Sequence, residues 1–269
     1  MTLKLAFIGG GNIAQAIIGG LIESGYPKDN IGVADPSEEQ GAHIKALGVS
    51  WFTRNQAVAP TADLVLLCVK PNLIEAVCND LGPSLRDKPL VSVAAGVTTE
   101  QLTRWSGSEQ VIRCMPNTPA LVGAGMLGLF ATSGMNSTLK AQVERLLSTV
   151  GVIAWFTAEA DLDAVTAISG SGPAYFFYLM EAMIEAAEGF NIDPDTAKTL
   201  VIQTALGAAH MASRGDATPK ALRENVTSPG GTTEAACRSL EAASFDRLIA
   251  AACEAARDRS ISLSQNSAP

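Results

Sequence analysis

The fold of this chain is decided by Leu3-Lys4-Leu5-Ala6-Phe7-Ile8-Gly9-Gly10-Gly11-Asn12-Ile13-Ala14-Gln15-Ala16-Ile17-Ile18. A short apolar run enters three glycines and a helical pattern follows at once, which is the order strand, tight turn, helix. Gly9, Gly11 and Ala14 match the G-x-G-x-x-G/A fingerprint of dinucleotide-binding folds. The sequence therefore predicts a phosphate site on the amides that open this helix, with a plain glycine-rich turn as the alternative.

Length and composition describe a globular protein with room for two domains. The chain has 269 residues, of which 47% are hydrophobic and 17% charged. A formal net charge of -8 without a Lys/Arg cluster argues against nucleic acid as a partner. Two long uncharged runs are broken by glycine, proline or asparagine, so we expect no membrane span. The 5 cysteines lack metal-type spacing, which predicts reduced thiols, no metal site and a cytoplasmic location.

Strand-like and helix-like segments alternate up to about residue 157. This alternation predicts an α/β fold with a Rossmann-type, doubly wound parallel sheet. Residues 62–69 are the clearest buried strand, because they form a continuous apolar run. Further strands are expected over residues 30–35, 49–52, 90–95 and 110–114, with 126–131 and 152–156 extending the sheet at one side.

From Asp161 onward, strand patterns give way to alanine-rich helical ones. Residues 173–188 and 195–214 are apolar over much of their helical circumference, so both helices need burial on several sides. We therefore expect an all-helical half that dimerises, with a self-contained bundle as the alternative. The predicted domains are 1–160, which binds the dinucleotide, and 161–269, which dimerises and binds the substrate.

Polar residues stand where the predicted strands end, the edge at which ligands bind in such sheets. Asp35 lies 26 residues after Gly9, near the position of a ribose-binding carboxylate. Lys70 is a candidate for phosphate or substrate contact, against the alternative of a solvent-exposed lysine. Asn117 is a candidate for nicotinamide or ribose contact, against turn chemistry between two prolines. Arg113 is the weakest candidate of this set.

A second group of candidates is Thr227-Ser228-Pro229-Gly230-Gly231-Thr232-Thr233, which leads into a helical pattern. Free amides and hydroxyls at a helix N-terminus are suited to a carboxylate. The alternative is that Thr232 or Thr233 only caps the helix. Neither of the 2 histidines is placed as a general acid. A dinucleotide enzyme of this kind suits an imine, which can arrive already protonated.

The motifs together resemble pyrroline-5-carboxylate reductase, the last enzyme of proline biosynthesis. The resemblance runs from the first strand to about Ala256. It rests on Phe7–Asn12, Val69–Pro71, Ala94–Gly96, Arg113–Ala120, Ser169–Tyr175 and Thr227–Thr233.

The resemblance implies a Rossmann domain and a helical domain that forms a homodimer, and larger rings of dimers occur in the family. It also implies reduction of 1-pyrroline-5-carboxylate to L-proline by NADPH, or less often NADH. Thr233 and Ser228 become the candidate catalytic hydroxyls, and Gly230, Gly231, Thr232 and Thr233, with Asp216, the candidate substrate site. With Asp35 and Asn117 included, the candidate cofactor residues are Ile8, Gly9, Gly10, Gly11, Asn12, Ile13, Asp35, Asn55, Cys68, Val69, Lys70, Pro71, Ala94, Ala95, Gly96 and Asn117.

Cofactor choice and two other functions stay open at this point. The charge of Asp35 favours NADH, because it repels a 2′-phosphate. The resemblance to the family favours NADPH. It also implies that Arg54 and Asn55 contact the adenosine part of the cofactor. A β-hydroxyacid-type dehydrogenase is the first alternative, although residues 173–190 lack the lysine that such enzymes commonly use. A non-catalytic dinucleotide sensor is the second.

Overall fold

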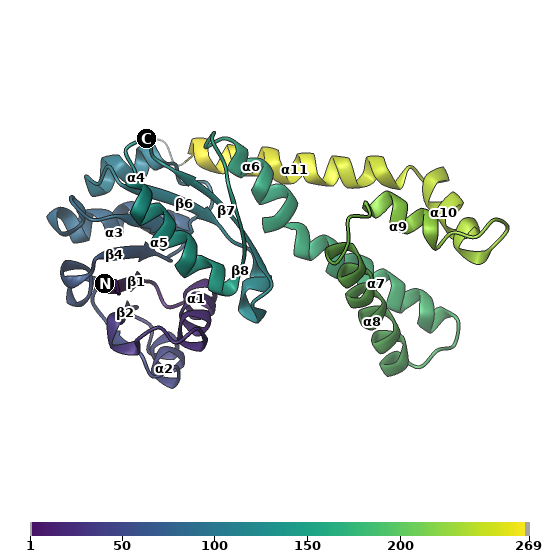
Figure 1. The fold of residues 1–269 in the computed structure, drawn as a ribbon, viewed down its shortest axis with the longest axis horizontal. Coiled ribbons are helices and arrows are strands. Elements are labelled where there is room, and N and C mark those ends of the chain that lie inside the picture. The colour runs from purple at the N-terminus through teal and green to yellow at the C-terminus, as the bar shows by residue number, and fades with distance from the viewer. Residues whose placement is uncertain (1, 267–269) are drawn as a thin grey trace. The chain divides into compact units, whose positions relative to one another are not determined.

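The computed structural model describes residues 2–266, with the backbone alone for Asn266. Within this range the chain forms two compact units (Figure 1). One contains residues 2–171 and 255–266, and the other contains residues 172–254. From the sequence we expect the dimerising module to begin after residue 160, and this boundary stays a prediction.

The first unit is built on one sheet of eight strands in the order β3-β2-β1-β4-β5-β6-β7-β8. Neighbouring strands from β3 to β6 pair in parallel, which confirms the Rossmann-type fold class. β7 and β8 extend the sheet on one side as expected, but β7 pairs antiparallel with β6. The connection between these two strands contains only the short 3-10 helix Thr118–Val122, whereas a parallel pair needs a longer crossover, and the chain returns antiparallel. The strands are β1 (Leu5–Ile8), β2 (Ile31–Ala34), β3 (Ser50–Phe52), β4 (Leu64–Leu67), β5 (Leu90–Ser92), β6 (Val111–Met115), β7 (Gly125–Ala131) and β8 (Gly151–Trp155).

Helices cover both faces of this sheet, and each face has its own apolar core. Along β1, Leu5 and Phe7 join one core, whereas Ala6 and Ile8 join the other. This alternation follows from the two-residue period of a strand. The first core contains side chains of α1, α2 and α5, and the second contains side chains of α3 and α4. The helices of this unit are α1 (Asn12–Glu23), α2 (Glu38–Ala46), α3 (Ile74–Leu81), α4 (Thr99–Ser106), α5 (Ser137–Leu147) and α6 (Asp161–Val165).

Local caps fix where several of these helices begin. Ser37 accepts a hydrogen bond from the Gln40 N–H, as its N-cap position ahead of α2 predicts. Thr98 and Gln101 form a capping box at α4, and Gly107 ends that helix in the left-handed conformation. After α6 the chain forms a π-helical turn over Thr166–Gly170, a geometry that is frequent at functional sites.

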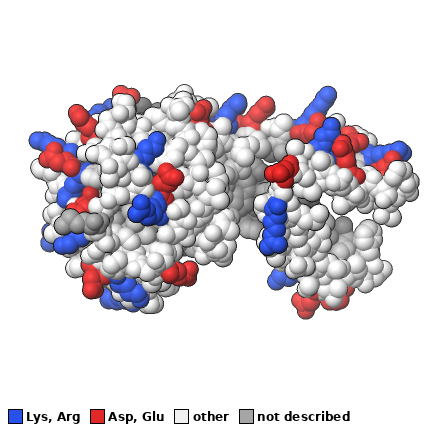
Figure 2. Space-filling view, in the orientation of Figure 1, with Lys and Arg blue, Asp and Glu red and all other residues white. Residues whose placement is uncertain are grey.

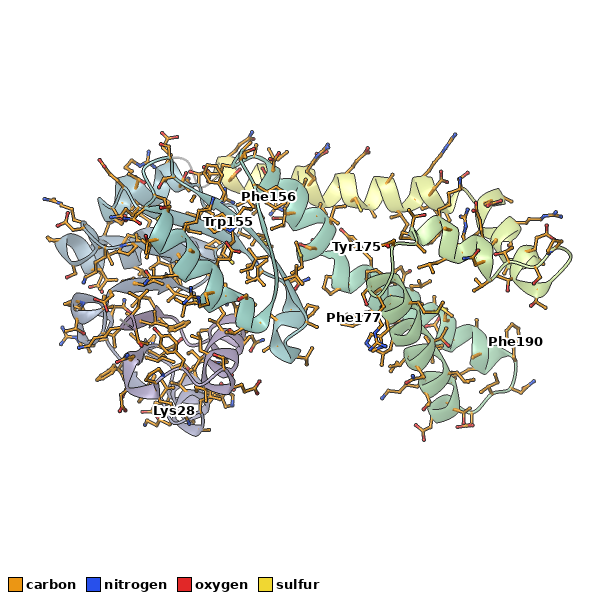
Figure 3. All side chains as sticks on the ribbon, viewed as in Figure 1. Lys28, Trp155, Phe156, Tyr175, Phe177 and Phe190 are labelled. Atoms are coloured by element: carbon orange, nitrogen blue, oxygen red, sulfur yellow. The ribbon has the colours of Figure 1, made fainter. Side chains whose placement is uncertain are left out.

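The second unit is helical and leaves large apolar side chains exposed. On α7, Phe177 is 62% exposed, and Phe190 just beyond that helix is 77% exposed (Figure 3). Among the described residues, no helix is both long and apolar enough to span a bilayer. On the face shown in Figure 2, acidic and basic side chains of the first unit are interspersed. The remaining helices are α7 (Gly172–Gly189), α8 (Pro194–Ser213), α9 (Pro219–Asn225), α10 (Thr232–Ala242) and α11 (Phe245–Asn266), the last of which begins in the second unit and ends in the first.

Two adjacent glycines of α1 predict opposite effects on stability. A β-carbon at Gly20 would lie 2.7 Å from Val150 Cγ1 and 2.8 Å from the Thr149 carbonyl oxygen, whereas one at Gly19 would meet no described atom within 4 Å. We expect Gly20→Ala to lower the free energy of unfolding by about 1–3 kcal/mol, because α1 must move away from this backbone. Gly19→Ala is the matched control and should raise the free energy of unfolding by about 0.5–1 kcal/mol. Chemical denaturation measures both, and equal stabilities of the two variants would contradict the packing described here.

Candidate active site

The glycine turn between β1 and α1 is shaped by its close approach to the end of β4. Gly9 has a left-handed backbone (φ +99°), and a β-carbon there would lie 2.7 Å from the Cys68 carbonyl oxygen. Gly11 is the N-cap of α1, and a β-carbon there would meet no described atom within 4 Å. The first amides of a helix lack intrahelical partners. This turn therefore provides room and amides that fit the pyrophosphate of a dinucleotide.

Asp35, which follows β2, is held by backbone amides at both carboxylate oxygens. The Gly10 N–H donates to Oδ2 and the Ser37 N–H donates to Oδ1, each at 2.8 Å. The Gly10 carbonyl accepts a 2.7 Å hydrogen bond from Gln15 Nε2, so both backbone groups of Gly10 are engaged. Asp35 therefore connects the glycine turn to the turn before α2, at the place predicted for a ribose-binding carboxylate.

The end of β3 lies beside Asp35 and brings Arg54 and Asn55 to the same edge. The Asp35 N–H donates to the Phe52 carbonyl at 3.0 Å. Arg54 follows two residues later and is exposed. Asn55 Nδ2 donates to Asp80 Oδ2 at 3.4 Å. Arg54 and Asn55 thus follow β3 at the same edge of the sheet as Asp35.

The segments after β4 and β5 continue this edge of the sheet. The Cys68 N–H donates to the Ile8 carbonyl at 2.7 Å, and the Val93 N–H donates to the Leu67 carbonyl at 3.1 Å. Burial raises the pKa of the half-buried Cys68 thiol to about 12, so this thiol is protonated at neutral pH. The parallel register gathers at one edge the predicted cofactor residues Ile8–Ile13, Asp35, Asn55, Cys68–Pro71 and Ala94–Gly96.

Asn117 follows β6 and Arg113 lies in the middle of that strand rather than at its end, and both side chains are engaged within the first unit. Asn117 Nδ2 donates to the Ser169 carbonyl at 3.0 Å, and its Oδ1 accepts a 2.9 Å hydrogen bond from the Met126 N–H. Asn117 therefore joins the end of β6 to β7 and to the π-helical turn, and its contact with a cofactor stays a prediction. Arg113 Nη1 lies 2.8 Å from Glu159 Oε1 and is directed away from solvent.

The predicted anion site lies in the second unit, at the start of α10. Gly231 is the N-cap, so neither Thr232 nor Thr233 caps this helix. Gly230 is left-handed (φ +72°), and its N–H donates to Glu234 Oε2 at 2.6 Å. Because Gly231 has no side chain, no hydroxyl competes for the amides of the first turn. This arrangement fits a carboxylate at those amides.

The other predicted substrate residues lie on exposed turns of the second unit. Ser228 is exposed two residues before the left-handed glycine, and its carbonyl accepts a 3.0 Å hydrogen bond from the Gly231 N–H. Asp216 is exposed between α8 and α9. Its role beside the substrate stays a prediction. Across the described residues, no three His, Cys, Asp or Glu side chains are grouped for a metal ion.

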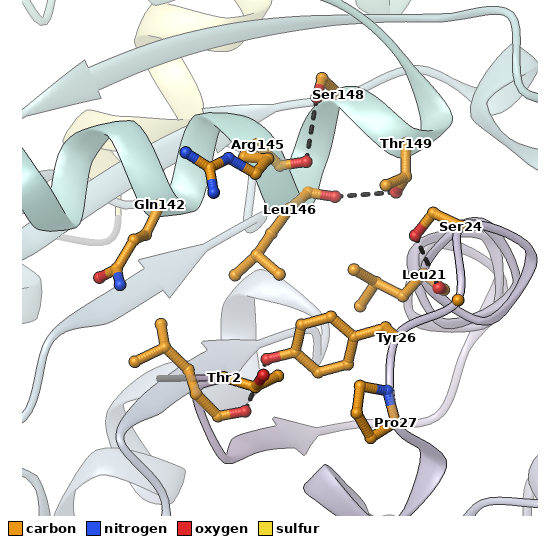
Figure 4. A pocket seen from close by; sticks show the side chains of 12 residues that line it. Thr2, Leu21, Ser24, Tyr26, Pro27, Gln142, Arg145, Leu146, Ser148 and Thr149 are labelled. Carbon is orange, nitrogen blue, oxygen red and sulfur yellow. Dashed lines mark hydrogen bonds between the residues drawn. The ribbon is translucent and has the colours of Figure 1, made fainter.

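A pocket of about 560 Å³ lies at the opposite edge of the sheet, beneath the start of β1 (Figure 4). Tyr26 and Arg145 are among its lining residues. The Tyr26 hydroxyl donates to the Leu3 carbonyl at 2.6 Å, and burial together with Asp63 raises the pKa of Tyr26 to about 12. Since ligands bind beyond the carboxyl ends of parallel strands, this pocket is separate from the candidate site.

Three side chains that support these sites were missed by sequence reasoning. They are Gln15 at the glycine turn, Glu159 beside Arg113, and Glu234 at the α10 turn. Glu234 had a local signal, because an acidic residue three positions after an N-cap often returns to the backbone. Glu159 had none, since it bonds to residues 46 and 60 positions away in the chain.

Comparison with known proteins gives a consistent result in both halves of the chain. Residues 159–263 match the family model described as pyrroline-5-carboxylate reductase dimerisation. Residues 4–96 match the model described as NADP oxidoreductase, coenzyme F420-dependent.

Individual relatives match over nearly their whole length. The pyrroline-5-carboxylate reductase of Pseudomonas aeruginosa is 46% identical over 267 residues, which cover 98% of each chain. The structure of the Coxiella burnetii pyrroline-5-carboxylate reductase matches with a TM-score of 0.92 at 40% identity, over 98% of this chain and 99% of that one. Plasmodium falciparum pyrroline carboxylate reductase, solved with NADP bound, matches with a TM-score of 0.88 at 32% identity, over 97% and 98% of the two chains. Identity of this extent along both chains places this protein in the pyrroline-5-carboxylate reductase family.

Proposed function

We propose that this chain reduces 1-pyrroline-5-carboxylate to L-proline with NADPH, the final step of proline biosynthesis. The observation that carries the proposal is a pair of glycine-shaped helix N-termini. One opens α1 after the Gly9–Gly11 turn, and the other opens α10 after the Gly230–Gly231 turn. Each presents backbone amides to an anion, so the first suits the cofactor pyrophosphate and the second the substrate carboxylate.

In this mechanism the chain binds, orients and supplies a proton. The amides of Thr232 and Thr233 hold the substrate carboxylate, and the Thr233 hydroxyl, with Ser228 nearby in sequence, relays a proton to the ring nitrogen. Asp216 borders the substrate. When bound, the reduced nicotinamide supplies the hydride. Reduction of a C=N bond needs one hydride at carbon and one proton at nitrogen. The Thr233 hydroxyl can pass that proton on and regain one from solvent, so a histidine is not required.

The two alternative functions fit the chain less well. A β-hydroxyacid-type dehydrogenase commonly uses a lysine on the first long helix of its second domain, yet α7 contains none. A non-catalytic sensor has no need for the Ser228–Thr233 turn, which is intact here. The reductase accounts for both observations.

We further infer that the helical unit makes a homodimer, or a ring of such dimers, in the cytoplasm. Exposed apolar side chains on α7 and α8, including Phe176, Phe177 and Leu206, support a subunit interface. All 5 cysteines are free thiols, which supports a reducing compartment. The module that dimerises is taken to begin after residue 160.

The activity itself is tested by following NADPH oxidation with and without 1-pyrroline-5-carboxylate. We expect oxidation that depends on the substrate and yields L-proline in equal amount. If the folded protein binds dinucleotide and still shows no turnover with either NADPH or NADH, that result would contradict the proposed reductase activity and favour the function of a sensor.

Cofactor preference is predicted to depend on Arg54. Asp35 is held by two amides where the ribose is expected and disfavours a 2′-phosphate there, so NADPH needs a nearby cation, and Arg54 is exposed at this corner. We expect the wild type to prefer NADPH, and Arg54→Ala to lower kcat/KM for NADPH about tenfold while sparing NADH, as the loss of one charged contact implies.

Arg86→Ala is the matched control, because it removes an exposed arginine that precedes β5, at the opposite edge of the sheet. Equal losses with both cofactors in Arg54→Ala, or a wild-type preference for NADH above about tenfold, would refute this assignment.

The proton-relay role is tested by the pair Thr233→Ala and Thr232→Ala. Both variants keep the backbone amides, so carboxylate binding is retained. We expect Thr233→Ala to lower kcat/KM by about 100-fold, as loss of general-acid assistance implies, and Thr232→Ala to change it little. Steady-state kinetics measures both, and full activity of Thr233→Ala would assign the proton to another donor.

A further inference from the structure

A carboxylate outside the predicted site joins three elements of the first unit. Glu159 lies in the turn before α6. Its Oε1 accepts hydrogen bonds from the Thr99 N–H at 2.7 Å and from Arg113 Nη1 at 2.8 Å. Its Oε2 accepts a 2.6 Å hydrogen bond from Thr99 Oγ1. One side chain thus connects the start of α4, the strand β6 and the segment that leads into α6.

This arrangement is poorly explained by stability alone. The Arg113 side chain is 9% exposed and that of Glu159 is 23% exposed, so both charges have lost most of their hydration. Such pairs often contribute no more to stability than apolar residues of the same volume. They do fix geometry, because removal of one partner leaves the other charge buried and unpaired. The structure therefore indicates a role in positioning.

What Glu159 positions is the segment after β5 that is predicted to line the cofactor. Thr99 comes three residues after Gly96, and the intervening Val97 is fully buried. The segment starts from a fixed point, since the Ala94 N–H donates to Ser92 Oγ at 3.3 Å. With both ends anchored, a shift of Thr99 must be taken up within residues 94–98, which include the Ala94–Gly96 segment.

The other side of this segment rests on the last turns of α11. A β-carbon at Gly96 would lie 3.2 Å from Leu263 Cβ and 3.3 Å from the Ser264 nitrogen. Ser260, which is 4% exposed, donates a 2.7 Å hydrogen bond from Oγ to Asp163 Oδ1 in α6. The Ala94–Gly96 segment therefore contacts α11 at Gly96 and leads to Thr99, which Glu159 holds, and both supports connect to the region of α6.

We propose that Glu159 is a positioning residue for NADPH: through Thr99 and Arg113 it sets the Ala94–Gly96 segment against the cofactor. This inference rests on the proposed function for the identity of the cofactor. Glu159 bonds to Thr99 and Arg113 and is not among the residues predicted to line the cofactor or the substrate, so we expect its loss to act on cofactor affinity through the displaced backbone.

The test compares Glu159→Gln with Glu144→Gln in the full chain. Glutamine has the same shape, but its Nε2 cannot accept a hydrogen bond, and Arg113 loses its counter-charge. Glu144 is a matched control, since it accepts a 2.8 Å hydrogen bond from Trp155 Nε1 on the surface, away from this segment. We expect the Kd and KM for NADPH to rise about tenfold in Glu159→Gln, with a smaller change in kcat. The reason is that the Ala94–Gly96 segment loses the support that holds it in place. Glu144→Gln should keep the wild-type values.

A second pair keeps the test decisive if Glu159→Gln does not fold. Thr99→Val removes the hydroxyl that donates to Oε2 and keeps the shape and the backbone N–H, whereas Thr99→Ser keeps the hydroxyl. We expect a higher Kd for NADPH in Thr99→Val and a near wild-type Kd in Thr99→Ser. A lower Tm with unchanged Kd and KM in the folded variants would overturn the proposal, because a purely structural role gives that result.

Failure of the proposed function is distinguishable from failure of this inference. A wild type that binds NADPH but does not reduce 1-pyrroline-5-carboxylate contradicts the reductase, while the Kd comparison still tests Glu159. A wild type with full turnover and variants with unchanged NADPH affinity would overturn the role of Glu159 alone. A wild type that binds neither NADPH nor NADH would overturn both.

Discussion

The close approach of Gly9 to the end of β4 is the constraint on which the rest of the first unit depends. Any side chain at Gly9 would collide with the Cys68 carbonyl, so only glycine lets β1 turn into α1 at this place. That turn sets the direction of α1, and Gly20 on the same helix allows close packing against Thr149 and Val150. The position of the amides predicted to bind the cofactor and the packing of this face of the sheet thus follow from close contacts at Gly9 and Gly20.

Much of this architecture was predictable because its causes are local in the sequence. Apolar runs bounded by turn residues indicated the strands, and Ser37, as a helix N-cap, indicated the start of α2. The glycine pairs at Gly9–Gly11 and Gly230–Gly231 indicated where helix N-termini are open to anions. These signals need only neighbouring residues, so they survive without knowledge of the tertiary structure. The fold class and both sheet extensions were therefore expected correctly, whereas the two anion sites stay predictions.

The parts that sequence reasoning did not predict depend on contacts between distant segments. The antiparallel direction of β7 depends on how a short connection folds back, and no residue in it specifies this alone. The amide of Asn117 is engaged by backbone groups of Ser169 and Met126, which come from separate parts of the chain. Glu159 finds Thr99 and Arg113 only after the sheet has formed. Polar side chains that support a site, rather than line it, thus have little local signature.

The path of α11 has a consequence for how the protein is made. This helix supplies the last residues of a unit whose other part ends at Ser171, and the whole of residues 172–254 is translated in between. Gly96 and Asp163 therefore emerge from the ribosome long before Leu263 and Ser260, their partners on α11. Domains generally fold as units during synthesis, N-terminal first. Here the dinucleotide-binding unit can complete its packing only after the helical unit has been translated.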